Sequence, residues 1–147
     1  KGEVDEDQPA TPLGQARIVR PGSRVTVVSY GAAVALALSA ADQMAGEGVS
    51  VEVIDLQTIQ PWDEATVLES LSRTHRLVIV HEAVEAFGVG AEIAARMADI
   101  GFDELDGPIV RVGAPFMPVP FAAALEQAYR PSVERVVAAI GKSLGKE

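Results

Sequence analysis

The sequence predicts an α/β domain in which a mainly parallel β-sheet is covered by helices on both faces. Short runs of β-branched residues alternate four times with longer segments, several of them rich in alanine. This alternation is typical of parallel strands joined by helical crossovers. The β-branched runs are apolar almost throughout, which indicates strands that are buried on both faces rather than on one.

Each expected strand is short and ends at a glycine, a proline or a polar residue. The strands are expected at residues 17–20, 25–30, 51–56, 76–81 and 109–112. The run at 25–30 (VTVVSY) is the strongest, because it follows a Pro-Gly-Ser turn and is stopped by Gly31. Residues 82–88 are expected to form a loop.

The expected helices are identified by the spacing of their apolar residues and by their capping residues. They are expected at residues 32–45, from Pro61 and Asp63 onward, at 89–100, at 122–129 and at 132–144. In the first, Val34, Leu38 and Ala41 share one face of the helix. Asp63 suits the N-cap of the second, where its carboxylate accepts free backbone N–H groups. Three prolines between 115 and 120 predict an extended segment before the fourth helix.

Composition restricts the classes of function. The chain of 147 residues fits one domain, predicted at 14–147 after a polar lead-in or linker at 1–13. It has no cysteine and only two histidines, and its net charge of −9 argues against nucleic acid as a partner. No apolar run approaches a membrane span and no leader is visible, so a cytoplasmic location without membrane contact is expected.

The acidic charge is uneven along the chain. Residues 81–106 carry seven acids and one base, a net charge of −6. Such a stretch is usually a solvated face, and it is also a surface that a basic partner would recognise.

The glycines at 88 and 90 lie where a phosphate-binding loop would lie, between a strand and a helix. The dinucleotide motif needs a third glycine where Ile93 stands, and the lysine of the P-loop motif is absent. A packing role is favoured instead. Gly90, Ala94 and Ala98 recur every four residues, which gives a flat helix face for close approach of another helix, within the domain or across a subunit interface.

Other single residues give no convincing catalytic set. Asp55 ends a strand, but the acid pair that would hold magnesium in a receiver domain is missing, so it is expected to accept hydrogen bonds from loop amides. His81 beside Glu82 suits acid–base chemistry, and the favoured alternative is a histidine satisfied by loop backbone. The aromatic residues Trp62, Phe102, Phe116 and Phe121 are expected to pack in the core or at an interface.

An ordered set of sequence phrases resembles one protein family over nearly the whole chain. The phrases are PLGQA at 12–16, VTVVSYG at 25–31, VEVIDLQTIQP at 51–61, RLVIVHE at 76–82, FGVGAEIAAR at 87–96, FDELDGP at 102–108, PVPF at 118–121 and PSV at 131–133. Together they resemble the C-terminal domain of the beta subunit of thiamine-diphosphate-dependent 2-oxo acid dehydrogenases. The resemblance implies a three-layer αβα fold of the transketolase C-terminal type, with five strands of which the first is antiparallel.

The resemblance also implies where the chemistry lies. In this family thiamine diphosphate and magnesium are bound between the alpha subunit, which carries a GDG motif, and the N-terminal half of the beta subunit. GDG is absent here. We therefore expect no catalytic, cofactor-binding or metal-binding residue in this chain, and no activity of the isolated domain.

Assembly is the role that the resemblance implies instead. The family's domain pairs beta subunits about a two-fold axis, here with Gly88, Gly90, Ala94 and Ala98 as the expected interface. It also docks the basic subunit-binding domain of dihydrolipoyl acyltransferase through a carboxylate that corresponds to Asp106, with Asp103 and Glu104 nearby. The alternative for Asp106 is that it only caps the turn before Pro108.

The substrate of the whole enzyme is left open by the residues of this chain. Pyruvate is favoured because FGVGAEI resembles that branch, and branched-chain 2-oxo acid and acetoin enzymes are the alternatives. A hypothesis of another class is a free-standing nucleotide-binding α/β module.

Overall fold

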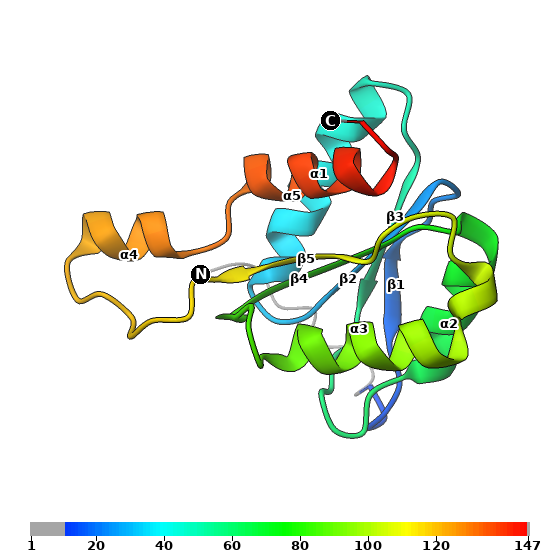
Figure 1. The fold of residues 1–147 in the computed structure, drawn as a ribbon, viewed down its shortest axis with the longest axis horizontal. Coiled ribbons are helices and arrows are strands. Elements are labelled where there is room, and N and C mark those ends of the chain that lie inside the picture. The colour runs from blue at the N-terminus through cyan, green and yellow to red at the C-terminus, as the bar shows by residue number, and fades with distance from the viewer. Residues whose placement is uncertain (1–10, 147) are drawn as a thin grey trace.

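Five strands form one sheet in the order β1-β3-β2-β4-β5 in the computed structural model, which describes residues 11–146 (Figure 1). The strands are β1 (Arg17–Arg20), β2 (Val25–Ser29), β3 (Val51–Asp55), β4 (Leu77–Val84) and β5 (Val110–Ala114). β1 pairs with β3 in the antiparallel direction, and all other pairs are parallel. The predicted fold, with its antiparallel first strand, is confirmed.

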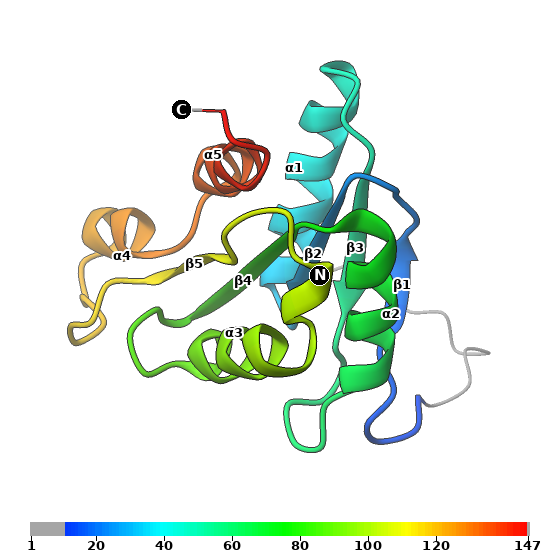
Figure 2. The ribbon, with the colours of Figure 1, turned by 45° about the vertical axis from the view of Figure 1, so that its right-hand side comes forward.

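Helices cover both faces of the sheet, so the fold has three layers (Figure 2). On one face lie α1 (Ala33–Gly46) and α5 (Val133–Ser143), and on the other lie α2 (Glu64–Thr74) and α3 (Val89–Ile100). A short 3₁₀ helix, η1 (Phe102–Glu104), follows α3. The remaining helix, α4 (Ala123–Tyr129), projects from the body of the domain beside the end of β5 (Figure 1).

Alternate residues of each central strand enter two separate cores. Val25 and Val27 of β2 pack under α1 and α5, whereas Val28 packs under α2 and α3. β4 divides in the same way, with Val78 on the first side and Ile79 on the second. Because side chains alternate between the faces of a strand, a strand with a core on each face must be apolar at nearly every position. This is why these runs show no polar alternation.

Two local features differ from the expectations. β4 continues to Val84, because after a register irregularity Val84 pairs with Ala114 of β5. The expected loop at 82–88 is therefore reduced to 85–88, and the sequence prediction of the strand end at His81 was wrong. The 3₁₀ turn at Phe102–Glu104 was not predicted. Of the expected lead-in at 1–13, residues 1–10 lie outside the described residues.

Candidate functional site

Three carboxylates follow α3 and form what we call the acidic corner: Asp103, Glu104 and Asp106. Asp103 and Asp106 are exposed, and neither side chain has a hydrogen-bond or ion-pair partner among residues 11–146. The turn is held instead by backbone atoms of the corner, since the Asp106 N–H donates to the carbonyl of His75 at 3.0 Å. The Asp106 carboxylate therefore does not cap the turn, and it is exposed to solvent.

The turn that carries the acidic corner lies against the C-terminal ends of α2 and α5. His75 ends α2 in the left-handed conformation, and its Nδ1 lies 2.9 Å from the carbonyl oxygen of Glu104. Arg76 donates to the carbonyl of Ser143 at the end of α5, at 2.7 Å. A Cβ at Gly107 would lie 2.2 Å from the same guanidinium and 2.9 Å from the backbone carbonyl oxygen of Ser143, so a larger residue there would displace neighbouring atoms. Asp103 and Asp106 thus present negative charge without a partner among residues 11–146, on a turn that is bonded to His75.

His81 is fully buried beside the start of α3 and is satisfied by backbone, as the favoured interpretation predicted. Its Nε2 accepts the Gly90 N–H at 3.0 Å, and its Nδ1 lies 3.0 Å from the carbonyl of Ala83. An N–H can only donate, so Nε2 is unprotonated and Nδ1 carries the proton that bonds to Ala83. The buried imidazole is shielded from solvent, which leaves it no route to a substrate.

The same contacts decide against a phosphate-binding loop. The Gly90 N–H that would face a phosphate is already donated to His81. A Cβ at Gly90 would lie 2.3 Å from His81 Nε2, and one at Gly88 would lie 1.9 Å from the carbonyl oxygen of Val84. Both glycines are therefore required for close packing of α3 and its entry loop on β4.

The small-residue stripe of α3 does not stay on one side of the helix. Gly90 is buried against β4, Ala94 is half-buried and Ala98 is exposed. Each step of four residues turns the position by about 40°, since an α-helix advances about 100° per residue. Only the Ala98 end of the stripe is open to another molecule in this structure.

Asp55 and Asp63 occupy the local roles that their positions predicted. Asp55 accepts a hydrogen bond from the backbone N–H of Gln57 at 3.2 Å. Asp63 caps α2 by accepting from the Thr66 N–H at 3.0 Å, and it also accepts from the Ala16 N–H at 2.9 Å. Burial acts to raise the pKa of Asp63, but these hydrogen bonds outweigh it and lower the pKa overall.

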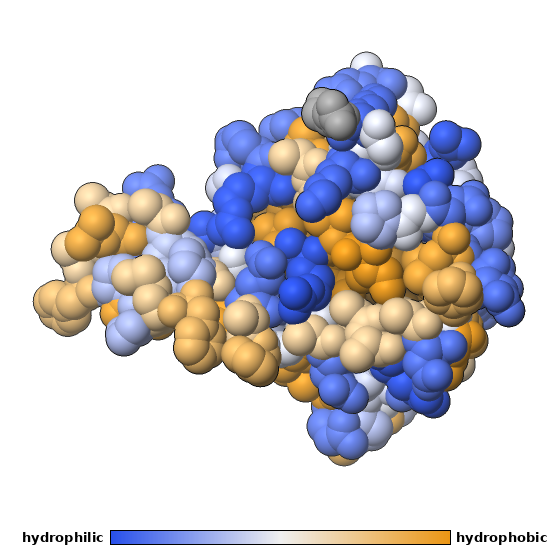
Figure 3. Space-filling view, viewed as in Figure 1, coloured by the Kyte–Doolittle hydropathy of each residue, from blue (hydrophilic) through white to orange (hydrophobic). Residues whose placement is uncertain are grey.

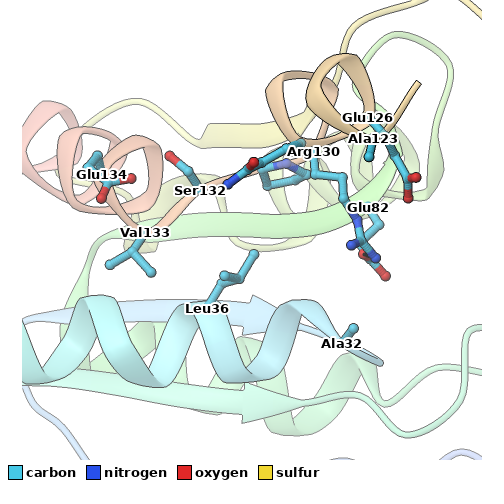
Figure 4. A pocket seen from close by; sticks show the side chains of 11 residues that line it. Ala32, Leu36, Glu82, Ala123, Glu126, Arg130, Ser132, Val133 and Glu134 are labelled. Atoms are coloured by element: carbon cyan, nitrogen blue, oxygen red, sulfur yellow. Dashed lines mark hydrogen bonds and ion pairs between the residues drawn. The ribbon is translucent and has the colours of Figure 1, made fainter. Parts of the chain in front are cut away.

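A groove of about 660 Å³ separates the N-terminal part of α1 from α4 and the start of α5 (Figure 4). Its apolar lining includes Leu36 and Val133, and its charged lining includes Glu82, Glu126, Glu134 and Arg130. Arg130 already pairs with Glu82 at 3.0 Å. With three carboxylates and one paired cation, the groove does not suit a diphosphate or another anionic ligand.

The segment from residue 115 to residue 129, which we call the apolar arm, carries a row of exposed large apolar side chains. They are Phe116, Met117, Val119, Phe121 and Leu125. Phe116 is 71% exposed and Phe121 is completely exposed. The two phenylalanines therefore do not belong to the core of this domain, and their packing at an interface stays a prediction. Trp62, by contrast, packs against the core under α2 and α3.

Within residues 11–146, no group of three or more acidic or histidine side chains is placed to hold a metal ion. No helix in the same range is long and apolar enough to cross a membrane. The described residues thus show no ligand set for magnesium, and the lining of the groove does not fit the diphosphate of a coenzyme.

Comparison with known proteins decides the family. The family model of the transketolase C-terminal domain matches residues 14–136. The chain belongs to the transketolase C-terminal domain family. This chain also superposes on a solved structure that is described as a split gene transketolase, inactive beta4 tetramer. The TM-score is 0.83 and the sequence identity is 28%, and the match covers 98% of this chain and 46% of the solved chain.

Curated relatives of this transketolase C-terminal domain are beta subunits of oxidoreductases, as the sequence resemblance predicted. The beta subunit of acetoin:2,6-dichlorophenolindophenol oxidoreductase of Bacillus subtilis is 43% identical over 99% of this chain and 43% of its own length. The pyruvate dehydrogenase E1 component subunit beta of Rickettsia felis is 44% identical over 95% of this chain and 43% of its own length. The mitochondrial subunit of Caenorhabditis elegans is 42% identical over 97% of this chain. The chain spans less than half the length of these relatives.

Burial lowers the pKa of His81, although the Ala83 carbonyl and Glu85 act to raise it. His81 of the unfolded chain therefore binds a proton as the pH falls through about 6.5, whereas His81 of the folded chain stays neutral until a lower pH. We expect the free energy of unfolding to be fully maintained above that pH and to fall as the pH decreases below it. Urea unfolding at pH 7.5, 6.5 and 5.5 measures this loss.

NMR can show which of the two histidines causes the loss of stability at low pH. The ring proton resonance of His81 should start to shift only below pH 6.5, and His75→Gln, which removes the other imidazole, should leave the pH dependence of stability in place. A His81 resonance that titrates at or above pH 6.5 would contradict the buried neutral tautomer.

Proposed function

We propose that this chain is the assembly and docking domain of the beta subunit of a 2-oxo acid dehydrogenase, in the component that decarboxylates the 2-oxo acid. The observation that carries the proposal is the acidic corner, where the exposed carboxylates of Asp103 and Asp106 have no partner among the described residues. Similarity to beta subunits over nearly the whole chain supports the wider role.

The docking partner is the small, basic subunit-binding domain of the dihydrolipoyl acyltransferase core. Complementary charge speeds encounter and fixes the orientation of the bound partner. Asp106 is the primary contact, and Asp103 and Glu104 extend the negative surface. Because His75 holds the corner through the backbone of Glu104 and Asp106, docking requires little ordering of the chain, which lowers the entropic cost of binding.

Pairing with a second beta subunit and with an alpha subunit completes the proposed assembly. The stripe of Gly88, Gly90, Ala94 and Ala98 contributes to the pairing face through its exposed end at Ala98, while the two glycines set the close packing of α3 on the sheet. In this proposal, thiamine diphosphate and magnesium belong to the assembled enzyme and are held outside this chain.

The proposed substrate is pyruvate, with acetoin and branched-chain 2-oxo acids as alternatives. Relatives named for pyruvate and for acetoin are equally similar to this chain, at 44% and 43% identity, so they leave this choice to the rest of the enzyme. A cytoplasmic location stays a prediction from the sequence, and some of the pyruvate dehydrogenase relatives are named as mitochondrial.

Replacing Asp106 by asparagine tests the docking role. We expect the subunit-binding domain to bind the assembled heterotetramer about 5- to 150-fold more weakly, because a charge-assisted contact contributes roughly 1–3 kcal/mol. Isothermal titration calorimetry at low salt measures the change. The difference between wild type and variant should shrink at high salt, where charge is screened.

Asp42→Asn is the matched control, since it removes the same charge from an exposed position on α1, on the opposite face of the sheet. It should leave the affinity within about twofold, because the ion pair that it breaks with Arg20 is a surface one. Equal affinities of Asp106→Asn and wild type at both salt concentrations would reject the docking assignment.

A further inference from the structure

The groove between α1, α4 and the start of α5 lies where open α/β sheets bind ligands. β2 and β4 are neighbours in the sheet, but β2 is followed by α1 on one face and β4 is followed by α3 on the other. Ligands of such sheets bind outside the carboxyl ends of the strands at this point of divergence. Ala32, three residues after β2, and Glu82, near the end of β4, both line the groove. Its volume of about 660 Å³ is within the range of small-molecule sites, about 300–1,000 Å³.

The charge of the groove selects for a cation. Three of its lining side chains are carboxylates, and the one lining cation among the described residues, Arg130, is bonded to Glu82 at 3.0 Å. Glu126 and Glu134 have no ion-pair partner within residues 11–146. A hydrogen bond from the Ser132 side chain, together with one from its own backbone N–H, lowers the pKa of Glu134, so this carboxylate is ionised at neutral pH.

Apolar side chains separate the charges at the two ends of the groove. Figure 4 shows Leu36 of α1 and Val133 of α5 facing each other across it. Glu134 lies toward one end, and Glu82 and Glu126 lie toward the other (Figure 4). A compact metal ion would meet carboxylates at only one end, and no group of three or more acidic or histidine side chains in the described range is arranged to hold one. A ligand that fits has a positive charge at each end and an apolar chain between them.

We propose that this groove binds a linear aliphatic diamine or polyamine. One ammonium group lies beside Glu134 and another beside Glu126 and Glu82, while the methylene chain between them lies on Leu36 and Val133. An ammonium group is a compact charge with three N–H donors, which suits carboxylates that approach from different directions. The acidic corner takes no part in this site, so amine binding and the docking role can each fail without the other.

A bound amine also joins α4 to the body of the domain. In the space-filling view, the segment that carries α4 stands out from that body (Figure 3). Arg130, the residue after α4, links this helix to β4 through its ion pair with Glu82. Glu126 lies in α4 and Glu134 lies in α5, so a ligand that contacts all three carboxylates bridges the three elements. Its binding should therefore slow the exchange of backbone amide hydrogens in α4.

Calorimetric titration of the whole 147-residue chain with spermidine tests the site, in about 0.1 M salt, where charges more than about 10 Å apart are largely screened. We expect saturable binding of one molecule per chain. Glu126→Gln with Glu134→Gln should weaken it about 100-fold, because each lost charge-assisted contact weakens binding roughly tenfold or more.

Glu69→Gln with Glu92→Gln is the matched control, since it removes two exposed carboxylates from α2 and α3, on the opposite face of the sheet. The control has the same net charge as the groove variant, and it should bind spermidine within about twofold of wild type because its charges are remote and screened. Thermal unfolding should show that both variants are folded.

Butylamine, which has one ammonium group on an aliphatic chain, measures the need for two charges. It should bind at least about tenfold more weakly than spermidine, because it leaves one end of the groove without a cation. Equal losses of affinity in the groove variant and the control variant would show that spermidine responds to net charge alone, and would reject the site. Wild type without saturable binding at millimolar spermidine also overturns it, as does a lysine-containing peptide that occupies the groove when spermidine does not.

Discussion

Replacing Gly90 by alanine is expected to lower the free energy of unfolding by about 2–4 kcal/mol, although alanine ordinarily stabilises a helix by about 1 kcal/mol over glycine. The new Cβ would lie 2.3 Å from Nε2 of the fully buried His81 and 3.2 Å from a methyl group of Ile79. The ring cannot move away without losing its bonds to the Gly90 N–H and the Ala83 carbonyl. Overpacking costs about 1–3 kcal/mol, and a lost buried hydrogen bond adds to it.

Chemical unfolding of the variant measures the loss, and Gly141→Ala is its matched control. Gly141 lies in α5, and a Cβ there would come no closer than 4.0 Å to any neighbouring atom. The control should therefore gain about 0.5–1 kcal/mol from helix propensity alone. If Gly90→Ala also gained stability, the contact between α3 and His81 would be looser than described.

Replacing Glu52 by alanine is expected to lower the free energy of unfolding by about 2–4 kcal/mol. Glu52 lies on β3 with its side chain buried under α2, where its carboxylate accepts from the hydroxyl of Ser70 at 2.5 Å and from Arg73 at 2.8 Å. The Ser70 hydroxyl in turn lies 2.5 Å from that of Thr26 on β2. Removing the carboxylate leaves buried hydroxyls with fewer acceptors, and buried polar groups without partners are costly.

Two further variants distinguish the contribution of the buried hydrogen-bond network around Glu52 from that of the carboxylate charge. Glu52→Gln keeps the shape and one acceptor oxygen, so it should lose only about half as much stability. Glu47→Ala removes an exposed carboxylate that pairs with Lys146 at 3.8 Å and should change stability by less than about 0.5 kcal/mol. Equal losses for Glu52→Ala and Glu47→Ala would contradict a structural role of the buried network.

Periodic features of the fold could be predicted from the sequence because they repeat over many residues. The apolar runs on either side of Gly31 and the cap at Asp63 depend on local chemistry, so their positions were confirmed within one or two residues. The antiparallel first strand came from the family resemblance, since pairing direction depends on contacts between distant segments. The extension of β4 to Val84 likewise depends on the pairing of Val84 with Ala114, so the sequence around Val84 does not indicate it.

Residues of the candidate surfaces were harder to predict for a physical reason. Exposure of Phe116 and Phe121 depends on α4 projecting from the domain, and the prolines before it indicate only an extended chain. The spacing of Gly90, Ala94 and Ala98 predicted a flat face, but it could not show that Gly90 faces an imidazole of the sheet rather than a neighbouring helix. The backbone bond from Asp106 to His75, which leaves the Asp106 carboxylate exposed, likewise joins distant segments and gave no signal in the sequence.

Calorimetric titration of the whole 147-residue chain with thiamine diphosphate and magnesium tests most directly whether this chain supplies binding surfaces and no catalytic centre. We expect no saturable binding heat up to about a hundred micromolar coenzyme, while the assembled heterotetramer titrated in the same buffer binds it. Micromolar binding of the coenzyme by this chain alone would contradict that expectation.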